Sequence, residues 1–126
     1  MLVKKSLVIF IFLPIFTIIA HASNVSAETI ETANFQIKIT RHCEEGNVSC
    51  GRVTYVGKNS TTGKSIRLNG KTINSSYSYR FLGYEFRNGK YTYYIDNNNL
   101  LQVYRGRELI LQEQGTAITS GRLRQR

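Results

Sequence analysis

Apolar and polar residues alternate along much of this chain, and no segment shows a convincing helical period. Between residues 35 and 40, for example, the apolar Phe35, Ile37 and Ile39 alternate with polar residues. A period of two is typical of a strand with one buried face. The same pattern predicts further strands at Arg52–Val56, Ser65–Leu68, Thr72–Ile73, Ser76–Phe81, Tyr84–Arg87, Lys90–Ile95, Leu100–Arg105 and Glu108–Glu113.

Turn-forming residues separate the predicted strands. Asn69-Gly70 and Asn88-Gly89 each lie between two alternating segments. Asn-Gly in this context predicts a hairpin with a type I′ turn, which needs a positive φ at both central residues. Asp96–Asn99 and Arg105-Gly106 predict two further turns, and Lys58–Lys64 predicts a polar loop. We therefore expect a meander of short antiparallel strands.

The predicted fold class is all-β, with one domain at residues 28–114. We expect a small antiparallel barrel of about eight short strands, because closure removes exposed strand edges. A two-layer β-sandwich is the alternative. Glu28–Ala33 is polar and is expected to be a loose lead-in, and residues 115–126 are expected to form a flexible basic tail. A final short strand around Ala117-Ile118 is left open.

The first 27 residues have the order of an export signal. Two lysines precede a mostly apolar run, and small residues suited to a signal peptidase follow at Ala20-His21-Ala22 and Val25-Ser26-Ala27. The apolar run is about 15 residues, shorter than the roughly 20 of a transmembrane helix. We predict a removed signal peptide, cut before Glu28 or alternatively before Ser23, and a periplasmic or secreted mature protein with no transmembrane segment.

Cys43 and Cys50 are the only cysteines, and both lie in the predicted mature chain. In an oxidising compartment the default expectation is a disulfide between them. Closing so short a loop contributes about 2–3 kcal/mol in the chain-entropy model. A zinc site would need about four ligands, and a redox pair is usually Cys-x-x-Cys, so a structural disulfide is the prediction.

The chain is strongly basic, with 17 lysines and arginines against eight acids. Two basic residues leave with the predicted signal, so the mature chain would carry a net charge of +7. Such a charge favours an anionic partner, such as an acidic protein, a polysaccharide, lipopolysaccharide or phospholipid headgroups. A solubilising surface without a partner is the alternative, and nucleic acid does not suit the predicted compartment.

Catalytic signatures are missing from the sequence. His42 is the only histidine outside the predicted signal, and it adjoins a cysteine expected to be oxidised. No Ser/His/Asp order, paired carboxylates or glycine-rich phosphate loop stands out. We therefore predict that the protein is not an enzyme and has no catalytic residues, no metal site and no cofactor.

The segment from residue 77 to residue 94 is dense in aromatic residues, with basic residues between them. Aromatic rings with a polar group suit the recognition of proteins or sugars. The alternative is that exposed tyrosines only cover their cross-strand neighbours. The predicted binding residues are Tyr84, Arg87, Lys90, Tyr91 and Tyr93.

The order of these parts resembles the bacterial periplasmic inhibitors of C-type lysozyme (the MliC/PliC-like family). The resemblance rests on Leu82–Phe86, on the turn Arg87–Gly89 and on Tyr91–Tyr94, followed by a closing hairpin at Leu100–Glu113. It implies a small antiparallel barrel and inhibition of lysozyme. The family's serine corresponds to Leu82 here, and its lysine is replaced, so the likeness is one of fold with key site residues missing.

The sequence thus predicts an exported, non-enzymatic binding protein that captures or neutralises an acidic protein or another anionic envelope partner, as an inhibitor or immunity protein would. A C-type lysozyme inhibitor is one alternative. An envelope-associated structural protein that binds lipopolysaccharide or anionic lipid is another.

Overall fold

The computed structural model describes residues 25–118 together with Ile11 and Pro14. Nearly all of the predicted signal peptide and the end of the predicted basic tail therefore lie outside the described residues. The described chain is all-β, as the alternation predicts. Its strands are β1 (Ser26–Glu31), β2 (Phe35–Arg41), β3 (Val53–Asn59), β4 (Ser65–Asn74), β5 (Phe81–Asn88), β6 (Tyr91–Asp96), β7 (Leu100–Arg105), β8 (Glu108–Gln114) and β9 (Thr116–Ile118).

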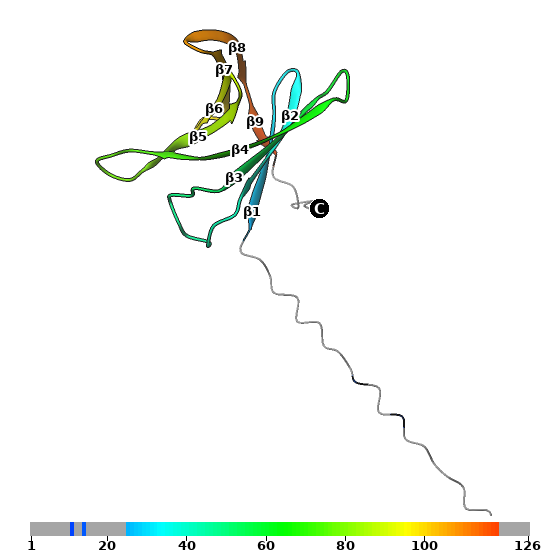
Figure 1. Ribbon diagram of the computed structural model, residues 1–126, viewed down its shortest axis with the longest axis vertical. Helices are drawn as coiled ribbons and strands as arrows, with labels where there is room; N and C mark the ends of the chain where they lie inside the picture. Colours follow the sequence, from blue (N-terminus) through cyan, green and yellow to red (C-terminus); the bar gives the residue numbers. More distant parts are fainter. Residues whose placement is uncertain (1–10, 12–13, 15–24, 119–126) are drawn as a thin grey trace, which may run out of the picture.

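These strands form one antiparallel sheet in the order β8-β7-β6-β5-β4-β3-β2-β1-β9 (Figure 1). Only Gly115 separates β8 from β9, and β9 pairs with β1, so the sheet rolls into a nearly closed barrel. We call the place where β8 and β9 meet β1 and the β1–β2 turn the seam. Asn34 in that turn strengthens the seam, because its backbone and side-chain N–H groups donate to the two carboxylate oxygens of Glu113 at 3.0 and 2.9 Å. The predicted barrel is confirmed, rather than the two-layer sandwich.

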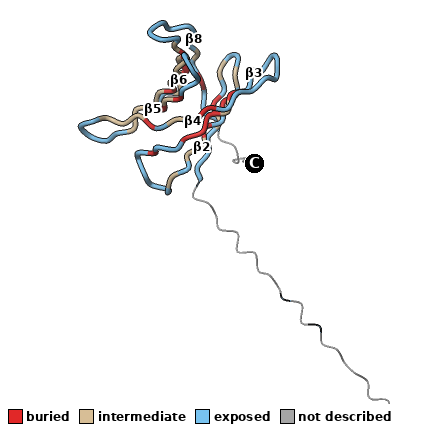
Figure 2. The backbone as a smooth tube through the Cα atoms, in the orientation of Figure 1, coloured by how far each residue is buried: buried red, intermediate tan, exposed pale blue. Residues whose placement is uncertain are grey.

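The inner face of the barrel holds the hydrophobic core. Along each strand, alternate residues point inward, and the most deeply buried side chains come from β1, β2, β3, β5, β6 and β7. Figure 2 shows the buried segments in the strands and the exposed segments mainly in the loops. Two aromatic rings meet near the centre, where the centroids of Tyr55 and Phe86 lie 5.2 Å apart.

The two Asn-Gly pairs behave differently from each other. Asn88-Gly89 lies at a hairpin, as predicted, but the two loop residues are Gly89 and Lys90, and of these only Gly89 has a positive φ, of 59°. The predicted turn at Asn69-Gly70 is wrong, because both residues lie inside β4. Gly70 is paired on both sides there, and a Cβ atom would collide with the carbonyl oxygen of Glu85 and the ring of Phe86. Glycine at this position permits close packing rather than a turn.

The predicted strand at Ser76–Phe81 is also wrong. Because β4 runs on to Asn74, residues 75–80 must reverse the chain and form a loop, in which the backbone N–H of Tyr79 donates to the carbonyl of Ser75. Tyr77 and Tyr79 are 98% and 73% exposed on this loop. Only Phe81, its last residue, belongs to a strand.

Both ends of the barrel domain extend further than predicted. The expected loose lead-in at Glu28–Ala33 is mostly strand, since β1 pairs with β2 along its whole length and buries Ile30. Ile30 is the only large apolar residue of this segment, so the sequence showed no alternation of apolar and polar residues that would predict a strand. The short final strand that the sequence left open is present as β9, although residues 115–126 were expected to be a tail.

Candidate functional site

Because the strands form a meander, their connections gather at two opposite ends of the barrel. We call one end the mouth, formed by the connections at residues 32–34, 60–64, 89–90 and 106–107. The other is the closed end, formed by the connections at residues 42–52, 75–80 and 97–99. In Figure 1 the long loops that follow β2 and β4 extend to the lower left, and the turns before β2, β4 and β8 point upward.

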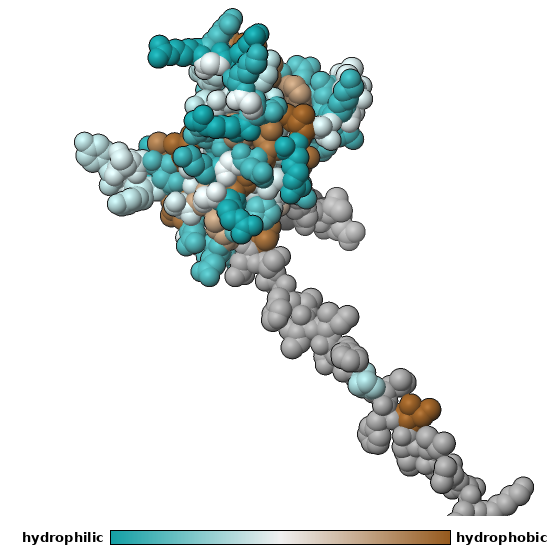
Figure 3. All heavy atoms as spheres, in the orientation of Figure 1, coloured by the Kyte–Doolittle hydropathy of each residue, from teal (hydrophilic) through white to brown (hydrophobic). Residues whose placement is uncertain are grey.

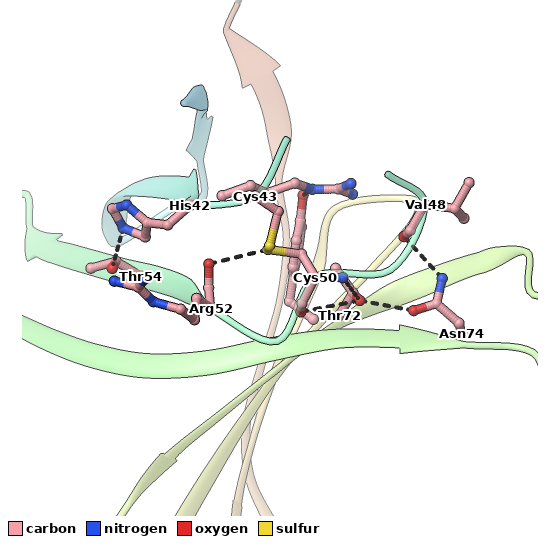
Figure 4. Close-up of a disulfide and its surroundings, with 10 residues drawn as sticks. His42, Cys43, Val48, Cys50, Arg52, Thr54, Thr72 and Asn74 are labelled. Atoms are coloured by element: carbon pink, nitrogen blue, oxygen red, sulfur yellow. Dashed lines mark hydrogen bonds between the residues drawn. A yellow bond between two sulfur atoms is a disulfide. The ribbon is translucent and has the colours of Figure 1, made fainter. Parts of the chain in front are cut away.

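The predicted disulfide is confirmed at the closed end. Cys43 and Cys50 are joined within the β2–β3 connection, with an S–S distance of 2.01 Å, and Cys50 is almost fully buried. The backbone N–H of Cys50 donates to the hydroxyl of Thr72 at 2.8 Å, and that hydroxyl donates to Asn74 (Figure 4). The side-chain NH₂ of Asn74 then donates to the carbonyls of Val48 and Tyr79. These bonds tie both long loops to β4.

Tyr84, one of the predicted binding residues, is buried near the closed end. Its hydroxyl accepts a hydrogen bond from Nε of Arg41 and donates one to Glu28, each at 2.9 Å. The Arg41 guanidinium also lies over the rings of Phe81 and Tyr84. Burial raises the pKa of Tyr84 to about 12, although the hydrogen bond from Arg41 acts in the opposite direction. Tyr84 therefore joins β1, β2 and β5, and the one hydrogen that its hydroxyl can donate is used within the fold.

The mouth opens onto a cavity of about 490 Å³ inside the barrel. Its apolar lining comes from Phe35, Ile66, Leu101, Val103, Ile110 and Leu111. Three tyrosines, one glycine and four polar residues complete it: Tyr55, Tyr91, Tyr93, Gly57, Asn59, Thr62, Lys64 and Asn88. Lys64 is the only charged residue in this lining. We call this space the mouth cavity.

Tyr55 and Tyr93 in the mouth cavity remain neutral hydrogen-bonding groups across the physiological pH range, because the pKa of each is raised. Burial raises the pKa of Tyr55, and the neighbouring Tyr93 and Glu113 raise it further. Burial also raises the pKa of Tyr93, against a smaller opposing effect of a hydrogen bond with Asn88. Among residues 25–118, no side-chain hydrogen bond engages the hydroxyl of Tyr55, and no fully buried polar side-chain atom lacks a partner. The Tyr55 hydroxyl must therefore reach the space of the cavity.

The outer surface of the barrel carries a second feature. Strands β2, β3 and β4 contain no acidic residue. Their outward-facing positions, together with the neighbouring part of β5, present the exposed side chains of Lys38, Lys58, Arg67, Lys71 and Arg87. We call this set the basic face. Hydrophilic side chains cover most of the barrel visible in Figure 3, with apolar patches between them.

Two acids border the basic face. Glu31 on β1 lies across from Gln36, which in turn lies across from Lys58. Glu85 lies directly across from Lys71 and forms an ion pair with Arg87 at 3.0 Å. This is the only ion pair between side chains in the part of the chain that the structure describes. Lys38, Lys58 and Arg67 are therefore left without an acidic partner within the fold.

The five predicted binding residues do not share one surface. Tyr91 and Tyr93 line the mouth cavity, and Lys90 lies in the turn beside it. Arg87 points outward on the basic face, whereas Tyr84 is buried near the closed end. The alternation within residues 84–93 places the tyrosines inside and Arg87 outside, a consequence of strand geometry that the prediction of a single face ignored.

Sequence reasoning missed Tyr55 and Lys64 in the mouth cavity and Lys38, Lys58 and Arg67 on the basic face. The alternation in β2 could have indicated the basic face, because Lys38 lies between two inward-facing residues, Ile37 and Ile39, and must therefore point outward. Nothing in the sequence indicated that Lys64, in a polar loop, would lie beside tyrosines from β3 and β6.

Residues 25–118 contain no cluster of three or more His, Cys, Asp or Glu side chains placed to hold a metal ion. No helix with the length and hydropathy of a membrane span occurs in the described chain. Comparison of the sequence and the structure with protein-family models, with curated proteins and with solved structures gives no match.

Proposed function

We propose that this is an exported, non-enzymatic binding protein that captures an acidic protein on its basic face. The main support for this proposal is the distribution of charge on the barrel. The adjacent strands β2, β3 and β4 carry outward-facing cations and contain no acidic residue. The disulfide is compatible with an oxidising compartment, which accords with the export signal predicted from the sequence.

The spacing of the cations suits several contacts at once. Lys38 lies across from Val56, which in turn lies across from Arg67. Neighbouring strands are about 4.8 Å apart, so the backbones at Lys38 and Arg67 are separated by roughly 10 Å. Carboxylates on a partner surface at similar spacing would meet both cations, and the Arg67 guanidinium offers two parallel donors to one carboxylate.

The affinity would depend on the number of contacts rather than on any single pair. An exposed ion pair is worth about 0–1 kcal/mol. The combined charge mainly steers the encounter and discriminates against basic partners. Binding through this face should therefore weaken as salt is added, because exposed charges are screened over about 10 Å at 0.1 M salt.

The test compares two double charge reversals with the same change in net charge. Lys38→Glu with Arg67→Glu alters the basic face, whereas Arg105→Glu with Arg107→Glu alters exposed residues beside the β7–β8 turn. Binding of the mature protein to immobilised poly-L-glutamate is measured at low salt. We expect the first variant to lose about tenfold or more in affinity, and the second to stay close to the wild type. Equal losses of affinity in the two variants would contradict binding through the basic face.

Anionic vesicles separate the acidic-protein proposal from the envelope-lipid alternative. Phosphatidylglycerol vesicles are offered to the same three proteins under the same conditions. Binding to vesicles without binding to poly-L-glutamate would favour a structural role at the envelope and would overturn the acidic-protein proposal.

Lysozyme inhibition, which the family resemblance implies, is the less favoured alternative. C-type lysozymes are basic, so the basic face would repel rather than attract them. We expect no inhibition in a turbidity assay with a large molar excess of the mature protein. Inhibition in that assay would support the alternative and show that a site other than the basic face acts.

A further inference from the structure

The mouth cavity has the size and composition of a ligand site rather than of a packing defect. Its volume of about 490 Å³ lies within the approximate 300–1,000 Å³ range of small-molecule sites, which are mostly apolar with a few polar groups. Barrel mouths are among the places where such sites occur. The mouth cavity fits this description, with apolar walls from several strands and a few polar groups near its opening.

The charges around the cavity select the kind of ligand. Lys64 lies at the opening and is the only charged residue in the lining. Glu113 is nearby but is not part of the lining, and both of its carboxylate oxygens accept hydrogen bonds from Asn34. An anionic group at the opening would therefore meet a free ammonium, whereas a cationic group would find no acid in the lining.

The loop that carries Lys64 is held in a defined conformation. The side-chain oxygen of Asn59 accepts hydrogen bonds from the backbone N–H groups of Thr61 and Thr62 at 2.9 and 3.0 Å. The backbone N–H of Asn59 donates to the carbonyl of Lys64 at 2.8 Å. These bonds place the start of the Lys64 side chain beside the cavity, so that less ordering is required when a ligand binds.

The interior offers one polar group for a second contact. The hydroxyl of Tyr55 reaches the cavity and takes part in no side-chain hydrogen bond among the described residues. The ring of Tyr93 lies against that of Tyr55, with centroids 5.5 Å apart. The two rings together provide an aromatic surface, and the Tyr55 hydroxyl offers a donor to a guest.

We propose that the mouth cavity binds a small amphipathic anion, whose apolar body lies between Val103, Leu111 and the tyrosine rings and whose anionic head pairs with Lys64. A fatty acid is the simplest member of this chemical class. This site is distinct from the basic face, and the inference does not depend on the capture of an acidic protein.

The experiment uses isothermal titration calorimetry with dodecanoate and, as its uncharged counterpart, dodecanol. Lys64→Gln removes the cation from the opening, and Arg107→Gln removes a cation from the neighbouring β7–β8 turn, outside the lining. We expect Lys64→Gln to weaken dodecanoate binding by about tenfold and to leave dodecanol binding unchanged. Arg107→Gln should change neither. Equal effects of the two variants on dodecanoate would overturn the assigned role of Lys64.

A third variant tests the cavity itself. Ile66 lines the cavity and is 40% exposed, so Ile66→Trp would fill part of the space without disturbing the deeper core. Binding of both ligands should be lost while the far-UV circular dichroism spectrum is retained. If the variant is misfolded, Leu111→Phe replaces it as a smaller filling change. Absence of dodecanoate binding to the wild-type protein, or binding that survives a folded filling variant, would overturn the proposal.

Discussion

The closed end and the mouth of this barrel use the same residue type for different purposes. At the closed end, the hydroxyl of Tyr84 accepts a hydrogen bond from Arg41 and donates one to Glu28. At the mouth, the hydroxyl of Tyr55 faces a cavity and forms no side-chain hydrogen bond among residues 25–118. A tyrosine whose bonds are all made within the fold holds strands together, whereas one with a free hydroxyl beside open space is suited to recognition.

The loops at the two ends differ in the same way. The β2–β3 connection is fixed by a disulfide and by hydrogen bonds to Thr72 and Asn74 of β4. The β3–β4 connection has no disulfide and is held by hydrogen bonds to Asn59 and by one from the Ser60 N–H to the Asn34 carbonyl. Lys64, at the end of this connection, lines the mouth cavity. We infer a division between the two ends, in which the closed end mainly supplies stability and the mouth binds the proposed ligand.

The largest expected effect is on stability, from truncation of a tyrosine at each end. Tyr84→Ala should lower the free energy of unfolding by about 3–5 kcal/mol, as for other buried aromatic residues. Tyr91→Ala at the half-exposed mouth should lower it by about 1–2 kcal/mol. Urea denaturation followed by circular dichroism measures both. Similar losses at the two positions would contradict the division.

Removal of the disulfide is the next largest change. Cys43→Ser with Cys50→Ser should reduce the free energy of unfolding by about 2–3 kcal/mol, because the unfolded chain gains the freedom that the short loop had removed. Dodecanoate binding by the folded fraction should stay the same, since neither cysteine lines the mouth cavity. A loss of dodecanoate binding in the folded double mutant would contradict the division, because it would show that the two ends are coupled.

A smaller effect is expected at the barrel seam in acid. Partial burial pushes the pKa of Glu113 upward, but hydrogen bonds from Asn34 and Thr32 outweigh it, so the folded-state pKa is lower than the ordinary 4.5. A lowered pKa stabilises the fold above pH 4.5, and this contribution disappears as the pH falls through the folded-state value. Asn34→Ala should therefore flatten the loss of stability below pH 4.5, as measured by urea denaturation at several pH values. An unchanged pH profile would contradict this role of the seam.

The sequence predicted the parts of this structure that depend on local pattern. The alternation in β2, the hairpin near Gly89 and the pairing of Cys43 with Cys50 all follow from residues close together in the chain. The turn at Asn69-Gly70 failed because the signal for a hairpin also fits a strand in which glycine permits close packing. Local pattern does not distinguish these cases, since the neighbouring strand that requires the glycine comes from residues 81–88.

The candidate sites were less predictable than the fold. Tyr91 and Tyr93 were expected to bind a partner, and both line the mouth cavity, but their neighbours there come from strands and loops far away in the sequence. Register determines which side chains meet inside a barrel, and register is set by all of the hairpins together. The position of Lys64 beside the tyrosines therefore becomes visible only once the sheet has closed.

The most direct test of the division between the two ends is NMR mapping of the amide signals of the mature protein during titration with dodecanoate. We predict chemical-shift changes that saturate together and cluster at the mouth, in residues 57–66, 88–93 and 101–111, while the amides of residues 41–52 and 72–84 stay in place. Changes centred on the closed end, or spread evenly over the barrel, would contradict the account.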